Sequence, residues 1–227
     1  MNKEKKNAVV VGATGNLGGA ISSALARIGY TLDPVWLAPD HPDATTEGAY
    51  MDLPKKIHVA VYCAGANIVK ETEQLSLDEW NRVFAVNVTG AFLFARAAFS
   101  AMKSAGNAAF ILVSSINVTH PYARRAAYVA SKAAVEGLTR ELAIEWGQYG
   151  IATHCIRLGH LSKFMKATPP NPEFLKAVSK KIPSGRFIEA EDVASYVVWL
   201  AEGGAKAVSG GVIDFDPAYM INLNPMA

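Results

Sequence analysis

A tyrosine and a lysine stand four residues apart in the segment Tyr128-Val129-Ala130-Ser131-Lys132. On a helix this spacing places both side chains on one face. A phenol has an ordinary pKa of about 10, and a nearby ammonium stabilises its ionised form, which makes the tyrosine a usable proton donor and acceptor near neutral pH. Such a pair also arises by chance, so the surrounding sequence must decide its role.

A glycine-rich segment, Gly12-Ala13-Thr14-Gly15-Asn16-Leu17-Gly18, follows the apolar run 8–11 and precedes a stripe of helical period. Glycines there permit a tight turn and a close backbone approach to a pyrophosphate, which would rest on amide groups at the positive end of the helix. An ordinary glycine-rich turn is the alternative. The strand before the segment and the helix after it favour a dinucleotide site.

The elements that must position these residues follow from the pattern of apolar runs. Short runs without in-out alternation recur between segments of helical period, as expected of parallel strands covered by helices on both faces. A chain of 227 residues with 51% apolar residues fits one domain. We therefore expect an α/β fold over 1–227, a single doubly wound, Rossmann-like parallel sheet. Strands are expected at 8–11, 57–62, 109–114, 151–156 and 212–215, and helices at 17–28, 92–102, 126–146 and 191–200, with further helices starting at Ser76 and Asn171.

The segment 30–57 breaks this rhythm. A strand near 32–37 leads into a proline-containing stretch with no room for a helix. If 48–52 were a third strand in the usual order, the chain would have to cross roughly 14 Å and also return over the sheet, on about six residues that reach roughly 20 Å. The sequence therefore predicts a sheet trimmed around its second and third strands.

Charge and cysteine usage exclude several classes of protein. Twenty-two basic against 20 acidic side chains leave a net charge of +2, too small a field to indicate nucleic acid or an anionic membrane as partner. Cys63 and Cys155 are far apart, so neither a disulfide framework nor a metal site is expected. The apolar runs are too short or too interrupted for a signal peptide or a membrane span. A cytoplasmic protein is expected.

Several motifs together resemble the short-chain dehydrogenase/reductase family over nearly the whole chain. Ser115 precedes Tyr128 by the family's usual 13 residues. The segment Asn87-Val88-Thr89-Gly90 is similar to the family's asparagine motif, and Ala64-Gly65 to the last half of its N-N-A-G motif. The segment 182–187 looks like the family's late segment. Agreement of so many motifs in order and spacing is very specific.

The resemblance implies an NAD(P)-dependent oxidoreductase that interconverts a carbonyl and a secondary alcohol by hydride transfer. Tyr128 would move the proton, Ser115 would hydrogen-bond the substrate oxygen, and Lys132 would hold the nicotinamide ribose and lower the pKa of the tyrosine. Asn87 would position a water that connects Lys132 to solvent. The alternatives are a non-catalytic NAD(P)-binding or redox-sensing protein, against which the complete tetrad argues, and a lyase or epimerase with bound NAD.

The resemblance also implies the cofactor contacts, with departures from the family's pattern. Asn16 stands where the common glycine loop has glycine, and Lys163 stands where a threonine usually grips the nicotinamide carboxamide. Trp36 replaces the acidic residue that binds the adenosine ribose, although Asp40 lies close by. No Lys or Arg between residues 27 and 55 is available for a 2′-phosphate, which favours NAD over NADP. The implied cofactor-binding residues are Gly12, Thr14, Gly15, Asn16, Leu17, Gly18, Asp52, Leu53, Ala64, Gly65, Tyr128, Lys132, Gly159 and Leu161.

The substrate is expected to be a small carbonyl compound or alcohol. Basic side chains near the site could bind an anion, but a solvated basic face is the stronger expectation. His58 and His154 are expected to be buried strand histidines with satisfied rings. The resemblance favours a homodimer or homotetramer through the helices 92–102 and 126–146. The pocket candidates are Asn117, Thr119, His120, Tyr122, His160, Phe164 and Met165, and the basic residues are Arg124, Arg125, Lys163 and Lys166.

Overall fold

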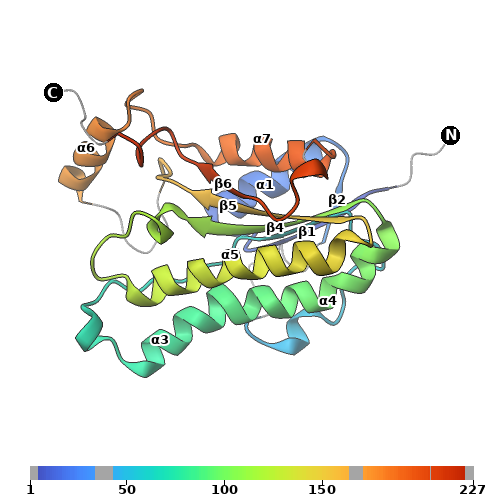
Figure 1. Ribbon diagram of the computed structural model, residues 1–227. Coiled ribbons are helices and arrows are strands. Elements are labelled where there is room, and N and C mark those ends of the chain that lie inside the picture. Colours follow the sequence, from blue (N-terminus) through green and yellow to red (C-terminus); the bar gives the residue numbers. More distant parts are fainter. Residues whose placement is uncertain (1–4, 34–42, 164–170, 205, 223–227) are drawn as a thin grey trace.

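A parallel six-stranded sheet forms the centre of the protein, as a computed structural model that describes residues 5–33, 43–163, 171–204 and 206–222 shows (Figure 1). The strand order is β2-β1-β3-β4-β5-β6 and every neighbouring pair is parallel. This confirms the doubly wound fold and the five expected strands. The strands are β1 Asn7–Val11, β2 Thr31–Leu32, β3 Val59–Tyr62, β4 Ala108–Ser115, β5 Ile151–Leu158 and β6 Val212–Phe215.

Helices cover both faces of the sheet (Figure 1). On one face α1 (Asn16–Arg27) and α7 (Ala190–Ala201) enclose a core with Ile21, Leu25 and Val193. On the other face α4 (Gly90–Ala105) and α5 (Ala126–Gly147) enclose a second core with Phe94, Met102 and Phe110. Two apolar layers explain why the strands are hydrophobic on both sides. The remaining helices are α3 (Leu77–Phe84) and α6 (Pro172–Lys181).

Local signals in the sequence set the helix ends. The Ser76 side chain accepts from the Glu79 amide at 3.2 Å while the Glu79 carboxylate accepts from the Ser76 amide at 2.9 Å, the reciprocal capping box that starts α3. Asn171 caps α6 through the Glu173 amide. Gly106, with a φ of +60°, ends α4.

The side of the sheet around β2 shows how the segment before β3 is arranged. The sheet is trimmed as predicted, since β2 has two residues and Glu47–Tyr50 form the 3₁₀ helix η1 where a third strand would have made the connection taut. The Tyr50 ring packs 5.5 Å from that of Phe94 on α4, and its hydroxyl donates to the Ala44 carbonyl at 2.9 Å. Burial of Tyr50 against α4 thus holds this segment on the face of the sheet that α4 covers. Beyond Asp33, the expected strand at 32–37 lies outside the described residues.

One continuous helical stretch, Leu77–Ala105, has the length and hydropathy to cross a membrane. It comprises α3, the π-helical turn η3 (Ala85–Thr89) and α4. Phe94, Ala98 and Met102 on this stretch are fully buried against the sheet. The apolar composition therefore reflects core packing.

Candidate active site

The carboxyl ends of the strands converge on one edge of the sheet. Ser115 of β4 lies opposite Leu158 of β5, which lies opposite Phe215 of β6. The chain also reverses direction across the sheet here, because β1 pairs with β2 on one side and with β3 on the other. Open α/β sheets bind ligands in the crevice that such a reversal leaves.

The glycine loop is packed so tightly that side chains are excluded. Gly12 has a φ of +90°, and a Cβ atom there would lie 2.8 Å from the Ala64 nitrogen. A Cβ atom on Gly18 would lie 2.2 Å from the Gly12 oxygen. Gly15 is the N-cap of α1, and no side chain caps this helix end. The first-turn amides therefore remain available to an anion, and the residues fit the pyrophosphate of a dinucleotide.

A second glycine keeps space open beside the lysine. A Cβ atom on Gly65 would lie 3.6 Å from Asn87 Oδ1 and 3.7 Å from Lys132 Nζ. Ala64 and Gly65 come one residue after the end of β3, next to the glycine loop that follows β1. The loops after these two strands therefore lie between the start of α1 and Lys132, as a bound dinucleotide would require.

Asn87 connects the loop after β3 to the helix that carries the tyrosine. This side chain is buried in η3, where Oδ1 accepts from the Ala66 amide at 2.7 Å and Nδ2 donates to Ser131 Oγ at 2.8 Å. Ser131 Oγ in turn donates to the Tyr128 carbonyl at 2.8 Å. A π-helical turn inside a longer helix often marks a functional position. Here it brings the Asn87 amide onto α5.

Lys132 joins α5 to the end of β4. Its ammonium donates to the Val113 carbonyl at 2.7 Å and lies 5.9 Å from the centre of the Tyr128 ring. Ser115 is 6% exposed, and its Oγ accepts from the Asn117 amide at 3.2 Å. The structure thus brings all four expected catalytic residues to the carboxyl end of β4. Such a cluster can hydrogen-bond an oxygen atom and exchange a proton with it.

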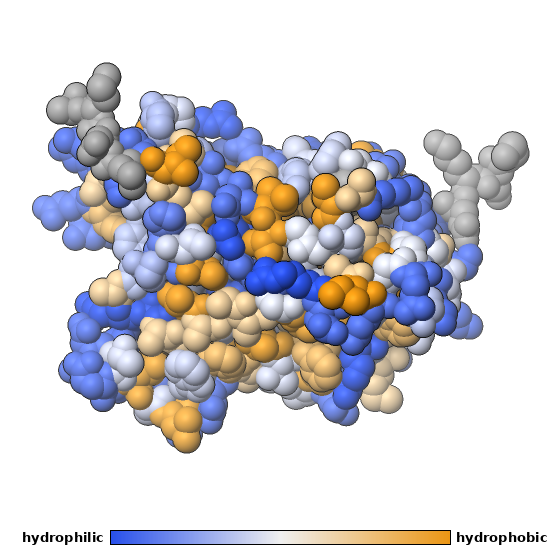
Figure 2. Space-filling view, in the orientation of Figure 1, coloured by the Kyte–Doolittle hydropathy of each residue, from blue (hydrophilic) through white to orange (hydrophobic). Residues whose placement is uncertain are grey.

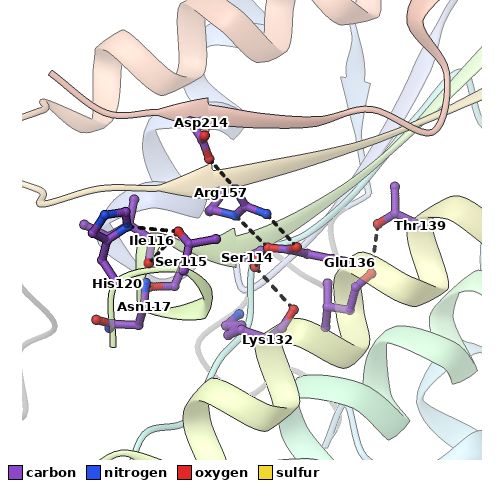
Figure 3. Close-up of polar contacts among 12 residues, drawn as sticks. Ser114, Ser115, Ile116, Asn117, His120, Lys132, Glu136, Thr139, Arg157 and Asp214 are labelled. Atoms are coloured by element: carbon purple, nitrogen blue, oxygen red, sulfur yellow. Dashed lines mark hydrogen bonds and ion pairs between the residues drawn. The ribbon is translucent and has the colours of Figure 1, made fainter. Parts of the chain in front are cut away.

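A buried ion-pair network lies behind these residues (Figure 3). Arg157 on β5 donates to both carboxylate oxygens of Glu136 on α5, at 2.9 and 2.8 Å, and to Asp214 on β6 at 2.8 Å. Ser114 Oγ donates to the same Glu136 carboxylate at 2.9 Å. Burial acts to raise the pKa of Glu136, but the hydrogen bonds from Arg157 and Ser114 and the Arg157 charge outweigh it and lower that pKa.

Sequence reasoning missed this network, although two signals were present. Glu136 follows Lys132 at a spacing of one helical turn, and Arg157 comes directly after the strand expected at 151–156. A cation in a buried strand needs a buried anion, and an acidic residue on the covering helix is the natural partner.

Aromatic side chains that carry hydroxyl groups or ring nitrogens line the side of the site where the substrate is expected. The Tyr122 hydroxyl lies 3.0 Å from His160 Nε2 and hydrogen-bonds the Tyr219 hydroxyl. Burial, with the nearby Arg125 charge, lowers the pKa of His160 to about 4, so the ring is neutral. Tyr219 comes from the segment after β6, whose role the sequence left open. Tyr219 and Met220 pack there on Ile116, the neighbour of Ser115.

Other expected residues lie in varied surroundings. Asp52 is exposed, and Leu53 is half-buried against the core beneath α4. Gly159 follows β5 directly, and Leu161 pairs with Ile188 in an isolated bridge. Trp36, Asp40, Phe164, Met165 and Lys166 lie outside the described residues.

The basic residues near the site are partly engaged. Arg124 lies 3.3 Å from the Glu71 carboxylate, and Arg125 lies over the Tyr122 ring.

Neither cysteine is poised for reaction, because burial raises the pKa of Cys63 to about 12 and that of Cys155 to about 11.

The two histidines that were expected in buried strands differ. His58 lies one residue before β3 and is half-buried, so that part of the expectation was wrong, but its ring is satisfied as expected because Nδ1 accepts from the Asn7 amide at 3.1 Å. His154 was expected to have a satisfied ring, but its Nδ1 has no hydrogen-bond partner among the residues that the structure describes. The ring is 2% exposed, and burial lowers its pKa to about 4. The ring lies at a cavity that Leu200 and Ser209 also line.

Comparisons with known proteins agree with this geometry. Residues 39–219 match the family model described as enoyl-(acyl carrier protein) reductase. D-threitol dehydrogenase of Mycolicibacterium smegmatis is 31% identical over 250 residues, which cover 95% of this chain and 93% of that protein. The (3R)-3-hydroxyacyl-CoA dehydrogenase of Canis lupus familiaris is 31% identical over 242 residues, with 91% and 93% covered. A putative NAD(P)-dependent gluconate 5-dehydrogenase from Beutenbergia cavernae, solved with NADP at low occupancy, is 27% identical with a TM-score of 0.87, covering 95% of this chain and 97% of that one.

Proposed function

Since the chain belongs to the short-chain dehydrogenase/reductase family, we propose that Tyr128 is the general acid and base of its reaction, supported by Ser115, Lys132 and Asn87. The protein is an NAD(P)-dependent oxidoreductase that acts on an alcohol or the corresponding carbonyl compound. The nicotinamide cofactor, when bound, accepts or supplies the hydride. The protein supplies orientation and the proton.

The proposed roles follow from which hydrogen-bonding atoms are already engaged. Ser115 Oγ accepts from the Asn117 amide, so its hydroxyl hydrogen remains free for the substrate oxygen. Lys132 uses one of three ammonium hydrogens on Val113, which leaves two for the nicotinamide ribose and for stabilising the ionised phenol of Tyr128. Tyr128 gives a proton to the carbonyl oxygen in reduction and removes it from the hydroxyl in oxidation.

One observation carries this proposal most directly, the hydrogen-bonded chain from Asn87 through Ser131 to the Tyr128 backbone. With the Lys132 contact to Val113, it fixes α5 relative to β4 and therefore Tyr128 relative to Ser115. Asn87 has a positioning role through these contacts. The water relay expected beside it stays a prediction.

The cofactor contacts and the preference for NAD also belong to the proposal. In this proposal the glycine loop holds the pyrophosphate, Gly65 lies beside the ribose, and Asp52 and Leu53 contact the adenine. The lack of Lys or Arg between residues 27 and 55 supports NAD, because a 2′-phosphate needs a cationic partner.

We propose a small polyhydroxylated substrate, such as a sugar alcohol or a sugar acid. Tyr122, His160 and Tyr219 bring two phenol hydroxyls and a ring nitrogen together near Ile116, the residue after Ser115. The hydroxyl groups of a polyol can form hydrogen bonds with these three groups. The names of the threitol dehydrogenase and of the putative gluconate 5-dehydrogenase support the same class.

A panel of substrates tests the proposal. The protein is incubated with NAD⁺ or NADP⁺ and with D-threitol, longer sugar alcohols, aldonates or a 3-hydroxyacyl thioester, and formation of the reduced cofactor is followed by absorbance. The proposal predicts turnover of a polyol or aldonate, faster with NAD⁺. Turnover of the thioester alone would contradict the substrate class, and faster turnover with NADP⁺ would contradict the cofactor preference.

Assembly and location complete the proposal. Figure 2 shows an apolar band over α5 and α4, the helices expected to join subunits. Phe92 on α4 is 47% exposed and Ile144 on α5 is 78% exposed. Covering such a surface with a second copy would remove it from water, which supports a homodimer or homotetramer. A cytoplasmic location is proposed from the cysteine usage.

A further inference from the structure

The loop after β5 is anchored firmly up to residue 163. The Ile188 amide donates to the His160 carbonyl at 3.0 Å, and the Ser162 amide donates to the Ile188 carbonyl at 2.8 Å. The Ser162 hydroxyl also donates to the carboxylate of Glu189, the N-cap of α7. These contacts attach the loop to the entry of α7 as far as Ser162, the residue before Lys163.

Lys163 is brought to the amino end of α1. Its carbonyl accepts a hydrogen bond from Asn16 Nδ2 at 3.4 Å, a contact between residues 147 positions apart. Asn16 is the first residue of α1 and follows Gly15, the N-cap. The loop from β5 therefore crosses to the glycine loop at the place where the helix presents its free amides.

The charge at this place is uncompensated. Lys163 is exposed, and within the described ranges no carboxylate lies at ion-pair distance from its ammonium. The first turn of α1 contains no acidic residue, and its amides carry the positive end of the helix dipole. An exposed ammonium without a described anion thus belongs to a residue whose backbone contacts the first residue of α1.

We propose that Lys163 binds the pyrophosphate of the dinucleotide together with the α1 amides. A pyrophosphate carries two negative charges, and an ammonium on a flexible stem binds it as a point charge. In the family a threonine at this position grips the nicotinamide carboxamide. Here the contact to Asn16 ties the Lys163 backbone to α1, where the phosphates rest. This inference depends on the dinucleotide site of the proposed function.

Three ligands distinguish which group of the cofactor the Lys163 ammonium contacts. NADH and NADPH share the pyrophosphate and the nicotinamide, NADPH adds a 2′-phosphate, and ADP-ribose keeps the pyrophosphate but lacks the nicotinamide. The test measures the dissociation constant of each ligand by calorimetry for the wild type, Lys163→Ala and Lys103→Ala. Lys103 is an exposed lysine in the last turn of α4, so its removal causes the same change in net charge at the far end of the sheet.

The proposal predicts that Lys163→Ala weakens all three ligands alike by about tenfold, as expected for one charge-assisted hydrogen bond at a partly exposed site. The deficit should shrink as salt is added, because salt screens an exposed charge pair. Lys103→Ala should bind each ligand like the wild type.

Other outcomes overturn the proposal in distinguishable ways. Unchanged binding by Lys163→Ala would place the ammonium in solvent. A loss for NADH and NADPH but not for ADP-ribose would assign it to the carboxamide, and a loss for NADPH alone would assign it to the 2′-phosphate. In each case the dinucleotide site would stand. A folded wild type that binds none of the three would contradict the proposed function as well.

Discussion

Arg157 on β5 and Glu136 on α5 form a two-pronged ion pair, with both nitrogen-to-oxygen distances below 3 Å. The pair lies one helical turn beyond Lys132, and Ser114, the neighbour of Ser115, donates to the same carboxylate. The two strands and the helix that carry the proposed catalytic residues are therefore joined directly behind them. Stability and active-site geometry depend on the same contacts.

Removal of the Glu136 carboxylate should destabilise the protein strongly. The Glu136 side chain is 4% exposed, so Glu136→Ala leaves Arg157 buried with only Asp214 as partner, at an expected cost of about 3 kcal/mol in the free energy of unfolding. The Asp214 side chain is 47% exposed, and Asp214→Ala should cost less than about 1 kcal/mol. Urea unfolding of both variants measures the difference. Equal costs would show that the network is not centred on Glu136.

His154 should make stability depend on pH. Its pKa is lowered from 6.5 to about 4 by burial, so between these values the unfolded chain takes up a proton that the folded protein does not. Stability therefore falls as the pH drops from 6.5 to 4, by roughly 2–3 kcal/mol from this residue.

Urea unfolding over this range measures the effect against a variant. His154→Gln removes the titrating group, so its free energy of unfolding should depend less steeply on pH than that of the wild type. His160 has a similarly lowered pKa and should leave part of the slope in the variant. Parallel pH profiles for the two proteins would mean that the His154 ring takes up its proton in the folded state as readily as in the unfolded chain.

A methyl group at Gly12 should disrupt the glycine loop. The φ of +90° and the 2.8 Å approach to the Ala64 nitrogen leave no room for a Cβ atom, so Gly12→Ala should lose dinucleotide binding and about 2 kcal/mol of stability. Gly48 on η1 has no atom within 4 Å of its would-be Cβ, and Gly48→Ala serves as the control. Calorimetric titration with NADH and urea unfolding check both effects. Wild-type binding by Gly12→Ala would refute the assigned loop.

The sequence allowed most of the fold to be predicted, because its signals are local. The apolar runs of β1, β3, β4, β5 and β6 and the caps at Ser76, Gly106 and Asn171 each act within a few residues. The trimmed sheet was predictable, but the 3₁₀ helix η1 in place of a third strand was not, since the gain from burying Tyr50 on α4 cannot be read from neighbouring residues.

The candidate site was predictable in part. Tyr128 and Lys132 share a helix face, and motif spacing indicated Ser115 and Asn87. Contacts between distant segments stayed hidden, such as Tyr219 against Tyr122 and Asn16 against Lys163, because nothing in linear spacing encodes which loops meet above the sheet.

Comparison of Tyr128→Phe with the wild type tests the central claim most directly. Both proteins are titrated with NADH, and both are assayed on the best substrate from the polyol panel. The account predicts that Tyr128→Phe binds the cofactor with near wild-type affinity while turnover falls by about 10³-fold or more, since the proton donor and acceptor is lost. Turnover that stays within a few-fold of the wild type would contradict the assignment of Tyr128 as general acid and base.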